Sequence, residues 1–255
     1  MTELLSKDHT ILEKGMMEFR PFGLDERGER IADLTGMIVR ANVDYLEELA
    51  AGRQGGIQAT QELCRLLNER IRDPAYHVNP AFLRKTWNGY SYEFVCYLRE
   101  FCQQLSGDPE FAFNAGRRKK ISPVFQILGR PFPVAEIYRM YPRFAQECAS
   151  KDMIEVHVES VTDRSAAVRL TYTERALRQF GPYRKRCAEL TCQSAKGGLA
   201  SIPEIVHHLP PATVRDRACM AKGDEWCVWE VTWTSPAGSN PFRFVWSWLR
   251  RTAGF

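Results

Sequence analysis

The first half of the chain repeats apolar residues at helical spacing, which predicts a series of amphipathic helices. The clearest pattern runs over residues 30–51, a second covers 57–71, and a third covers 92–105. The third is apolar around much of its circumference, so we expect it to be central. Shorter helices are predicted from the cap Asn79-Pro80, from Asp108 to Gly116, over 123–128, and over 133–141, where Pro142 should force a break or a bend.

The pattern changes near residue 153, where apolar and polar residues begin to alternate. Alternation over 153–161 and 167–172 predicts two strands, and a hairpin is expected over 213–234. Between them, a helix over 182–195 should end at Gly197-Gly198, with a separate apolar stretch over 202–209. The chain is therefore predicted to be α+β: a helical N-terminal part, followed by helices packed on a small antiparallel β-sheet. Its expected divisions are 1–78, 79–235 and 236–255.

Composition indicates the cellular compartment and argues against some partners, but it does not indicate the function. The chain has 255 residues and a net charge of +4, too weak a basic excess to argue for nucleic acid. It lacks an apolar run of membrane-spanning length and a signal-peptide core, so we expect a cytoplasmic protein with no membrane partner. Its eight cysteines should then stay reduced, and close cysteines are more typical of a metal site or a buried core than of a disulfide.

The hairpin holds the most informative residues. If Gly223 is the centre of a three-residue loop, Cys219 and Cys227 face each other across the two strands. Together with Asp216 and Cys192 they offer the four donors that a structural zinc site prefers. On a regular strand Asp216 and Cys219 point to opposite faces, so a bulge is required. The alternative is that these cysteines are small core residues.

A cluster of aromatic residues predicts a pocket for an aromatic or tetrapyrrole ligand. A histidine would fix the ligand's polar part, and a haem axial ligand could come from His157, His207 or His208. The alternative for each aromatic residue is a packed aromatic core. The proposed ligand-binding set is Trp87, Tyr90, Phe94, Tyr97, Tyr138, Tyr141 and His207.

A resemblance to a known family follows from the order of these features. They are Gly107-Asp108 after the central helix, the helix end at Gly116, the strand pair over 153–172, Gly197-Gly198, and Asp216-x2-Cys219-x7-Cys227 with its Gly223-Asp224 turn. Over about residues 90–235 the chain resembles the vinyl-4-reductase-like sensor domain of bacteria, which is also the input module of aromatic-sensing activators. That domain is distantly akin in shape to haem–nitric-oxide sensor domains. In the aromatic sensors the matching hairpin carries Glu-x2-Cys-x7-Cys, and an upstream cysteine completes a zinc site.

The resemblance implies a ligand-binding sensory module of a bacterial signalling protein, with a small hydrophobic, aromatic or tetrapyrrole ligand and either zinc or haem as cofactor. Residues 1–78 would then serve dimerisation, 79–235 would be the sensor domain, and 236–255 would form an aromatic helix or a linker to an output domain outside this chain. A homodimer is expected from the apolar stripe of 31–49 and the aromatic tail. The alternative is an enzyme that acts on a tetrapyrrole or another hydrophobic substrate, although the sequence contains no recognisable catalytic motif.

Overall fold

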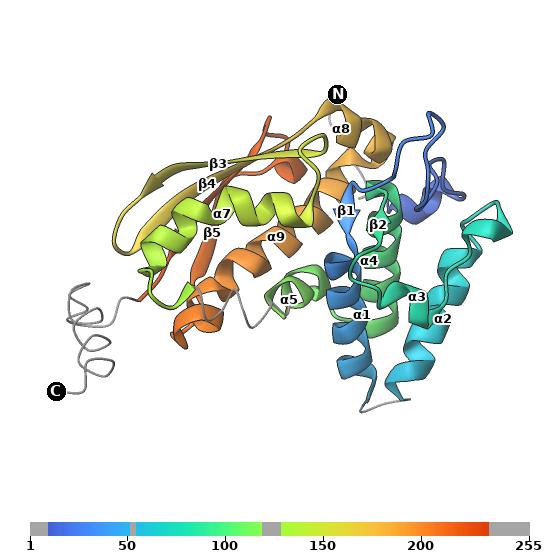
Figure 1. Cartoon of the computed structure of the whole chain (residues 1–255), viewed down its shortest axis with the longest axis horizontal. Coiled ribbons are helices and arrows are strands. Elements are labelled where there is room, and N and C mark those ends of the chain that lie inside the picture. The colour runs from blue at the N-terminus through green and yellow to red at the C-terminus, as the bar shows by residue number, and fades with distance from the viewer. Residues whose placement is uncertain (1–9, 52–54, 119–128, 235–255) are drawn as a thin grey trace, which may run out of the picture.

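Helices fill the first half of the chain and a β-sheet the second, as the apolar spacing predicts (Figure 1). The computed structural model describes residues 10–51, 55–118 and 129–234. The helical half consists of η1 Ile11–Lys14, β1 Leu34–Thr35, α1 Gly36–Ala51, α2 Gly56–Asn68, η2 Pro74–Tyr76, α3 Pro80–Leu83, β2 Gly89–Tyr90, α4 Tyr92–Ser106 and α5 Phe111–Arg117.

The described part of the second half combines three α-helices with one antiparallel sheet, whose strand order is β3-β4-β6-β5. The predicted α+β fold is therefore confirmed. The predicted helix over 123–128 lies outside the described residues. The elements of this half are α7 Val134–Cys148, β3 Ile154–Val161, β4 Ser165–Tyr172, α8 Glu174–Phe180, η3 Gly181–Tyr183, α9 Arg184–His207, β5 Thr213–Ala218, η4 Met220–Lys222 and β6 Cys227–Thr232.

Helix α4 is the centre of the helical half. Ser91 caps its first turn by accepting a hydrogen bond from the Phe94 N–H, and Gly107 ends it in the left-handed conformation. Every residue from Tyr92 to Cys102 is buried. The helix contacts α1, α2, α5, α8 and α9, so the prediction of a central helix is confirmed.

One face of the sheet is buried and the other is open. Alternate residues of the two inner strands point to the buried face, where α7 and α9 pack. On β3 the outward residues Glu155 and His157 are exposed. The buried inward residues of β4 and β6 are Ala166, Val168, Leu170, Tyr172, Cys227, Trp229 and Val231.

The first long helix begins later than its apolar pattern predicts. The prediction started at Arg30, but α1 starts at Gly36 because the preceding backbone bonds elsewhere. Leu34 pairs with Tyr90 in β2, and the Asp33 carbonyl accepts a hydrogen bond from the Ser150 N–H. These long-range bonds hold the segment before Gly36 extended, and they cannot be read from local periodicity.

Helix α9 does not end at Gly197-Gly198, so that prediction was wrong. It continues to His207 and absorbs the predicted stretch over 202–209. Gly197 is needed for contact between helices, because a Cβ there would lie 2.0 Å from the Phe113 carbonyl oxygen of α5. A Cβ on Gly116 would likewise lie 2.2 Å from the Ser194 carbonyl oxygen. The two glycines let α5 and α9 cross in direct backbone contact.

The predicted break at Pro142 is also absent, since α7 runs through it to Cys148. Proline removes one intrahelical hydrogen bond. The helix nevertheless continues, and Ala145 is buried in the turn beyond Pro142 while α7 packs against β3. Tertiary packing thus outweighs the local preference.

The segment before β1 is held by a buried carboxylate. Glu93 is fully buried, its Oε1 lies 2.5 Å from Lys14 Nζ, and its Oε2 accepts hydrogen bonds from the Glu18 and Phe19 N–H groups. The Glu93 N–H in turn donates to Gln179 in α8. A charge-assisted network therefore fixes the N-terminal segment to α4.

One hydrophobic core spans residues on both sides of position 78. The division into 1–78 and 79–235 stays a prediction. The apolar residues Ile31, Ile38 and Leu46 are buried inside the chain, so the stripe on 31–49 no longer argues for a dimer. No helix within the described ranges combines the length and the apolar character needed to cross a bilayer.

Candidate functional site

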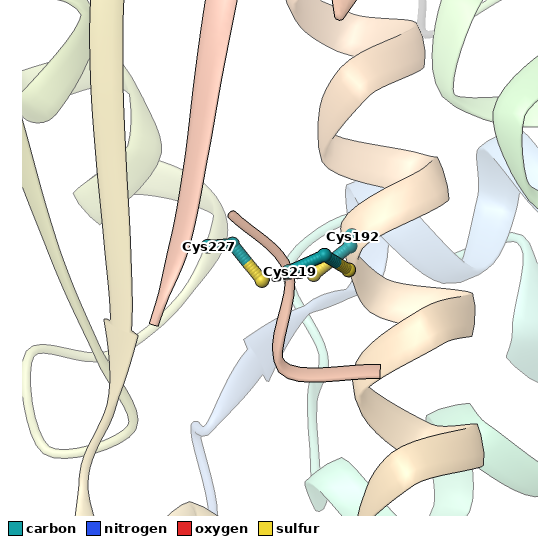
Figure 2. Close-up of side chains that lie close together, drawn as sticks. All are labelled: Cys192, Cys219 and Cys227. Atoms are coloured by element: carbon teal, nitrogen blue, oxygen red, sulfur yellow. Dashed lines mark hydrogen bonds between the residues drawn. The ribbon is translucent and has the colours of Figure 1, made fainter. Parts of the chain in front are cut away.

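Three cysteines from separate elements meet between α9 and the β5–β6 hairpin (Figure 2). Cys192 lies in the middle of α9, Cys219 follows β5, and Cys227 begins β6. Their sulfur atoms all lie within 4.8 Å of one another, and the Cys192 and Cys227 sulfurs are 2.7 Å apart. All three side chains are buried. The structure therefore brings together the three predicted sulfur donors.

The hairpin register explains why the two hairpin cysteines face each other. Asp216 pairs with Trp229, but Ala218 pairs with Val228, so a bulge shifts the register between them. The shifted register places Cys219 opposite Cys227. The predicted three-residue loop was wrong, because the connection contains η4 and ends its turn at Gly223 in the left-handed conformation. The bulge, rather than a tight loop, aligns the cysteines.

The cluster favours one thiolate and two thiols. The pKa of the Cys219 thiol is lowered by hydrogen bonds from the Cys192 and Cys227 thiols, and further by the Ala221 and Lys222 backbone N–H groups. Hydrogen bonds to Cys219 and Cys227, together with burial, raise the pKa of Cys192. Backbone N–H donors aimed at one sulfur stabilise its anion, which is the form that binds metals.

Asp216, the fourth predicted donor, lies apart from the sulfurs despite the bulge. Its carboxylate forms ion pairs with Lys196 Nζ at 3.2 Å and with Lys222 Nζ at 3.1 Å. It does not belong to the group of close ligand atoms. Lys196 comes from α9 and Lys222 from η4, and both neutralise the Asp216 carboxylate. These ion pairs explain why Asp216 lies away from the sulfurs.

The aromatic residues of α4 and the segment before it pack against different neighbours. The Tyr90 ring stacks on Phe94 with centroids 5.2 Å apart, and both rings are fully buried. The Tyr97 hydroxyl donates to the Gly15 carbonyl. Trp87 lies at the surface, 72% exposed. Tyr90 and Tyr97 contact the N-terminal segment through Phe22 and Gly15, whereas Trp87 does not take part in this interface.

The remaining predicted ligand-binding residues lie on the sheet side. The Tyr138 hydroxyl donates to the Leu199 carbonyl at 2.9 Å, and its ring stacks on Trp233 with centroids 4.7 Å apart. Burial raises the pKa of Tyr141. His207, at the end of α9, is half-buried, with its Nε2 lying 2.9 Å from the Phe132 carbonyl oxygen. The ligand-binding role of this set stays a prediction.

Two side chains beside the cluster escaped the sequence analysis. The Tyr172 hydroxyl lies 3.5 Å from the Cys192 sulfur, and Tyr172 points inward because it follows the alternation of β4. Arg99 is buried, and its guanidinium donates to the Thr191 and Ser194 hydroxyls on the turns of α9 around Cys192. The alternation along β4 could have predicted that Tyr172 points inward. No sequence pattern could have predicted that Arg99 bonds to α9.

Comparison with known proteins gives structural matches only. No family model matches the chain, and no curated protein does either. A Cs H-NOX mutant superposes with a TM-score of 0.54 at 10% identity, covering 80% of this chain and 98% of that one.

A mutant of T. tengcongensis H-NOX gives a TM-score of 0.53 at 10% identity, with 80% of this chain and 99% of that one covered. The chain has the H-NOX fold. The Fe(II) unliganded H-NOX protein from K. algicida agrees, with a TM-score of 0.50 at 10% identity and coverages of 80% and 98%. The H-NOX fold extends over nearly the full length of each neighbour. The resemblance to the vinyl-4-reductase-like domain itself stays a prediction.

Proposed function

We propose that this chain is a ligand-binding sensory module. The observation that carries the proposal is its H-NOX fold, which matches almost the whole length of haem-binding sensor domains. Such a module needs a ligand site joined to an element that passes the change onward. Helix α9 meets this need, because it contacts α4 and α5 in the helical half and β5 and β6 in the sheet.

The resemblance to the vinyl-4-reductase-like domain is the finer form of this proposal. It is supported by the meeting of the hairpin cysteines with the upstream Cys192, the arrangement that the resemblance implies. We propose that these three sulfurs bind zinc, with a water molecule in the fourth position, because Asp216 is paired with two lysines. Bound metal would then tie the hairpin to α9.

Haem is the second candidate ligand, favoured by the Fe(II) H-NOX protein among the structural neighbours. The four histidines that the structure describes fit it poorly. Among the described residues, His77, His157 and His208 lie toward the surface and His207 is half-buried, so none offers an axial donor from the interior. We therefore rank a small aromatic molecule above haem.

The expected assembly also stays a proposal. An output domain outside this chain would receive the signal, and a homodimer would require a surface other than the buried apolar face of α1. The enzyme alternative remains a hypothesis without a supporting contact.

Ligand titration of the purified full chain tests the proposed function. Phenol and haemin should be added separately, with the melting temperature, the visible spectrum and calorimetric heat as readouts. We expect saturable binding of one of them at about one molecule per chain, with a rise in melting temperature. A visible Soret band with haemin would move haem ahead of phenol. If neither probe binds, the proposal of a hydrophobic-ligand sensor fails.

A further inference from the structure

The sulfur cluster contains three thiols and lacks a fourth protein donor of the usual kind. Among the described residues, Cys192, Cys219 and Cys227 form a group without any histidine nitrogen or carboxylate oxygen. The nearest expected carboxylate, that of Asp216, is held by Lys196 and Lys222. Structural zinc sites are almost always four-coordinate, with all four donors from the protein. Zinc would therefore need a water molecule to complete its shell, whereas an ion that takes three ligands is complete with these sulfurs.

Burial adds a condition on charge. Cys192 and Cys227 are 1% and 0% exposed, and Cys219 is 5% exposed. A net charge at such a place is costly unless it is paired. Three thiolates leave zinc with one net negative charge, the same as the single thiolate of the empty cluster, and Cu(I) with two, whereas a trivalent ion leaves the site neutral. The nearby cation Lys196 is already paired with Asp216.

We propose that Cys192, Cys219 and Cys227 form a three-thiolate site for a trivalent thiophilic metalloid of the arsenite and antimonite class. The proposal rests on the sensory function proposed above and names the ion that its metal site prefers. The reaction balances without an oxidant: As(OH)3, two thiols, one thiolate and one solvent proton give As(SR)3 and three water molecules. Three As–O bonds and two S–H bonds break, three As–S bonds form, and the two thiol protons and the solvent proton leave in the water molecules. Soft sulfur donors favour soft ions in this way.

The position of the site gives the ion an effect on the fold. Cys192 belongs to α9, while Cys219 and Cys227 lie where β5 and β6 meet the connection between them (Figure 2). One ion bound to all three would crosslink the helix to the sheet edge. Arg99 joins the same stretch of α9 to α4 through Thr191 and Ser194. The bound state would therefore be transmitted to the helical half.

A second close thiol pair must be separated from this site. Cys96 of α4 and Cys187 of α9 are hydrogen-bonded neighbours in the core. They offer two sulfurs, and two-sulfur binding of arsenic would be weaker. Cys187→Ser is thus the matched control, since it removes a buried thiol of the same helix outside the cluster.

The test is titration of the reduced full chain with arsenite, zinc and Cu(I), followed by native mass spectrometry and near-ultraviolet absorbance. We expect one arsenic per chain with the loss of three protons, and tighter binding of arsenite than of zinc. Each of Cys192→Ser, Cys219→Ser and Cys227→Ser should weaken arsenite binding more than about tenfold. Asp216→Asn and Cys187→Ser should leave it unchanged.

Alkylation mapping of the wild type keeps the test valid if a serine variant fails to fold. Arsenite should protect all three cluster cysteines from iodoacetamide at once. Protection of two or fewer would overturn the proposal. Tighter binding of zinc than of arsenite would also overturn it, and if that binding is independent of Asp216 the proposed zinc site stands. If no ion binds, both the metalloid site and the proposed zinc site fail.

Discussion

At the scale of single residues, the proposed metal site depends on three cysteines. The sequence predicted Cys219 and Cys227 on facing strands, with Cys192 of the preceding helix as a further donor, and the structure brings these three together. Asp216 could not be placed from the sequence, because its partners Lys196 and Lys222 come from α9 and η4. Strand periodicity predicts the face of the sheet on which a side chain lies, but it does not predict the ion pairs that Asp216 forms.

Replacing one cluster cysteine should separate a metal site from a buried thiol. We expect zinc to raise the melting temperature of the wild type and to have no effect on Cys227→Ser, because metal binding energy adds to folding energy. Thermal unfolding with and without zinc measures this. Cys64→Ser, a buried cysteine of α2 outside the cluster, should keep the full response. An equal zinc response in Cys227→Ser would refute the site.

Glu93 should make stability depend on pH. Burial is the largest cause that raises the pKa of this carboxyl above its ordinary value of 4.5, against the lowering effect of Lys14 and of backbone N–H groups. A raised native pKa means that the native state binds the proton more tightly. This contribution to stability is present below the unfolded value and is lost as the pH rises through the native pKa.

Glu93→Gln should flatten that part of the stability curve, which urea unfolding from the ordinary pKa of 4.5 up to neutrality would show. Some slope should remain, because burial also raises the pKa of Asp33. The exposed Glu155→Gln serves as the control. If Glu93→Gln keeps the wild-type slope, Glu93 does not titrate as described.

At the scale of elements, local signals worked where caps and pattern agreed. Helix α4 was predicted closely because Ser91 caps it, Gly107 ends it, and its apolar residues surround it. Helix α9 was cut short because two adjacent glycines usually mark a helix end. Gly197 is required by its close contact with α5, which lies far away in the sequence. The periodicity of apolar residues does not predict that contact.

The two glycines of α9 give a matched pair of substitutions. Gly197→Ala places a methyl group against the Phe113 carbonyl, so it should destabilise the protein by a few kcal/mol, roughly the cost of overpacking a core. A Cβ on Gly198 meets no atom within 4 Å, so Gly198→Ala should stabilise the protein by about 0.5–1 kcal/mol through helix propensity. Chemical denaturation measures both. Equal effects would contradict the close α5–α9 crossing.

At the scale of the whole molecule, fold class was readable and function was less so. The alternation beginning near residue 153 predicted the sheet, and the helical spacing predicted the front. The aromatic residues show the limit of such reasoning. Tyr97 and Tyr138 were grouped as one pocket by composition, yet one bonds to Gly15 and the other to Leu199 and Trp233. Composition cannot tell an aromatic core from an aromatic site.

The proposed metal site joins α9 to the β5–β6 hairpin of an H-NOX fold through three sulfurs. X-ray absorption spectroscopy of the zinc-loaded full chain tests it most directly, with Asp216→Asn measured beside the wild type. We predict three sulfur neighbours at about 2.3 Å and one oxygen or nitrogen neighbour in both proteins. Fewer than three sulfurs, or a zinc environment that changes in Asp216→Asn, would contradict the account.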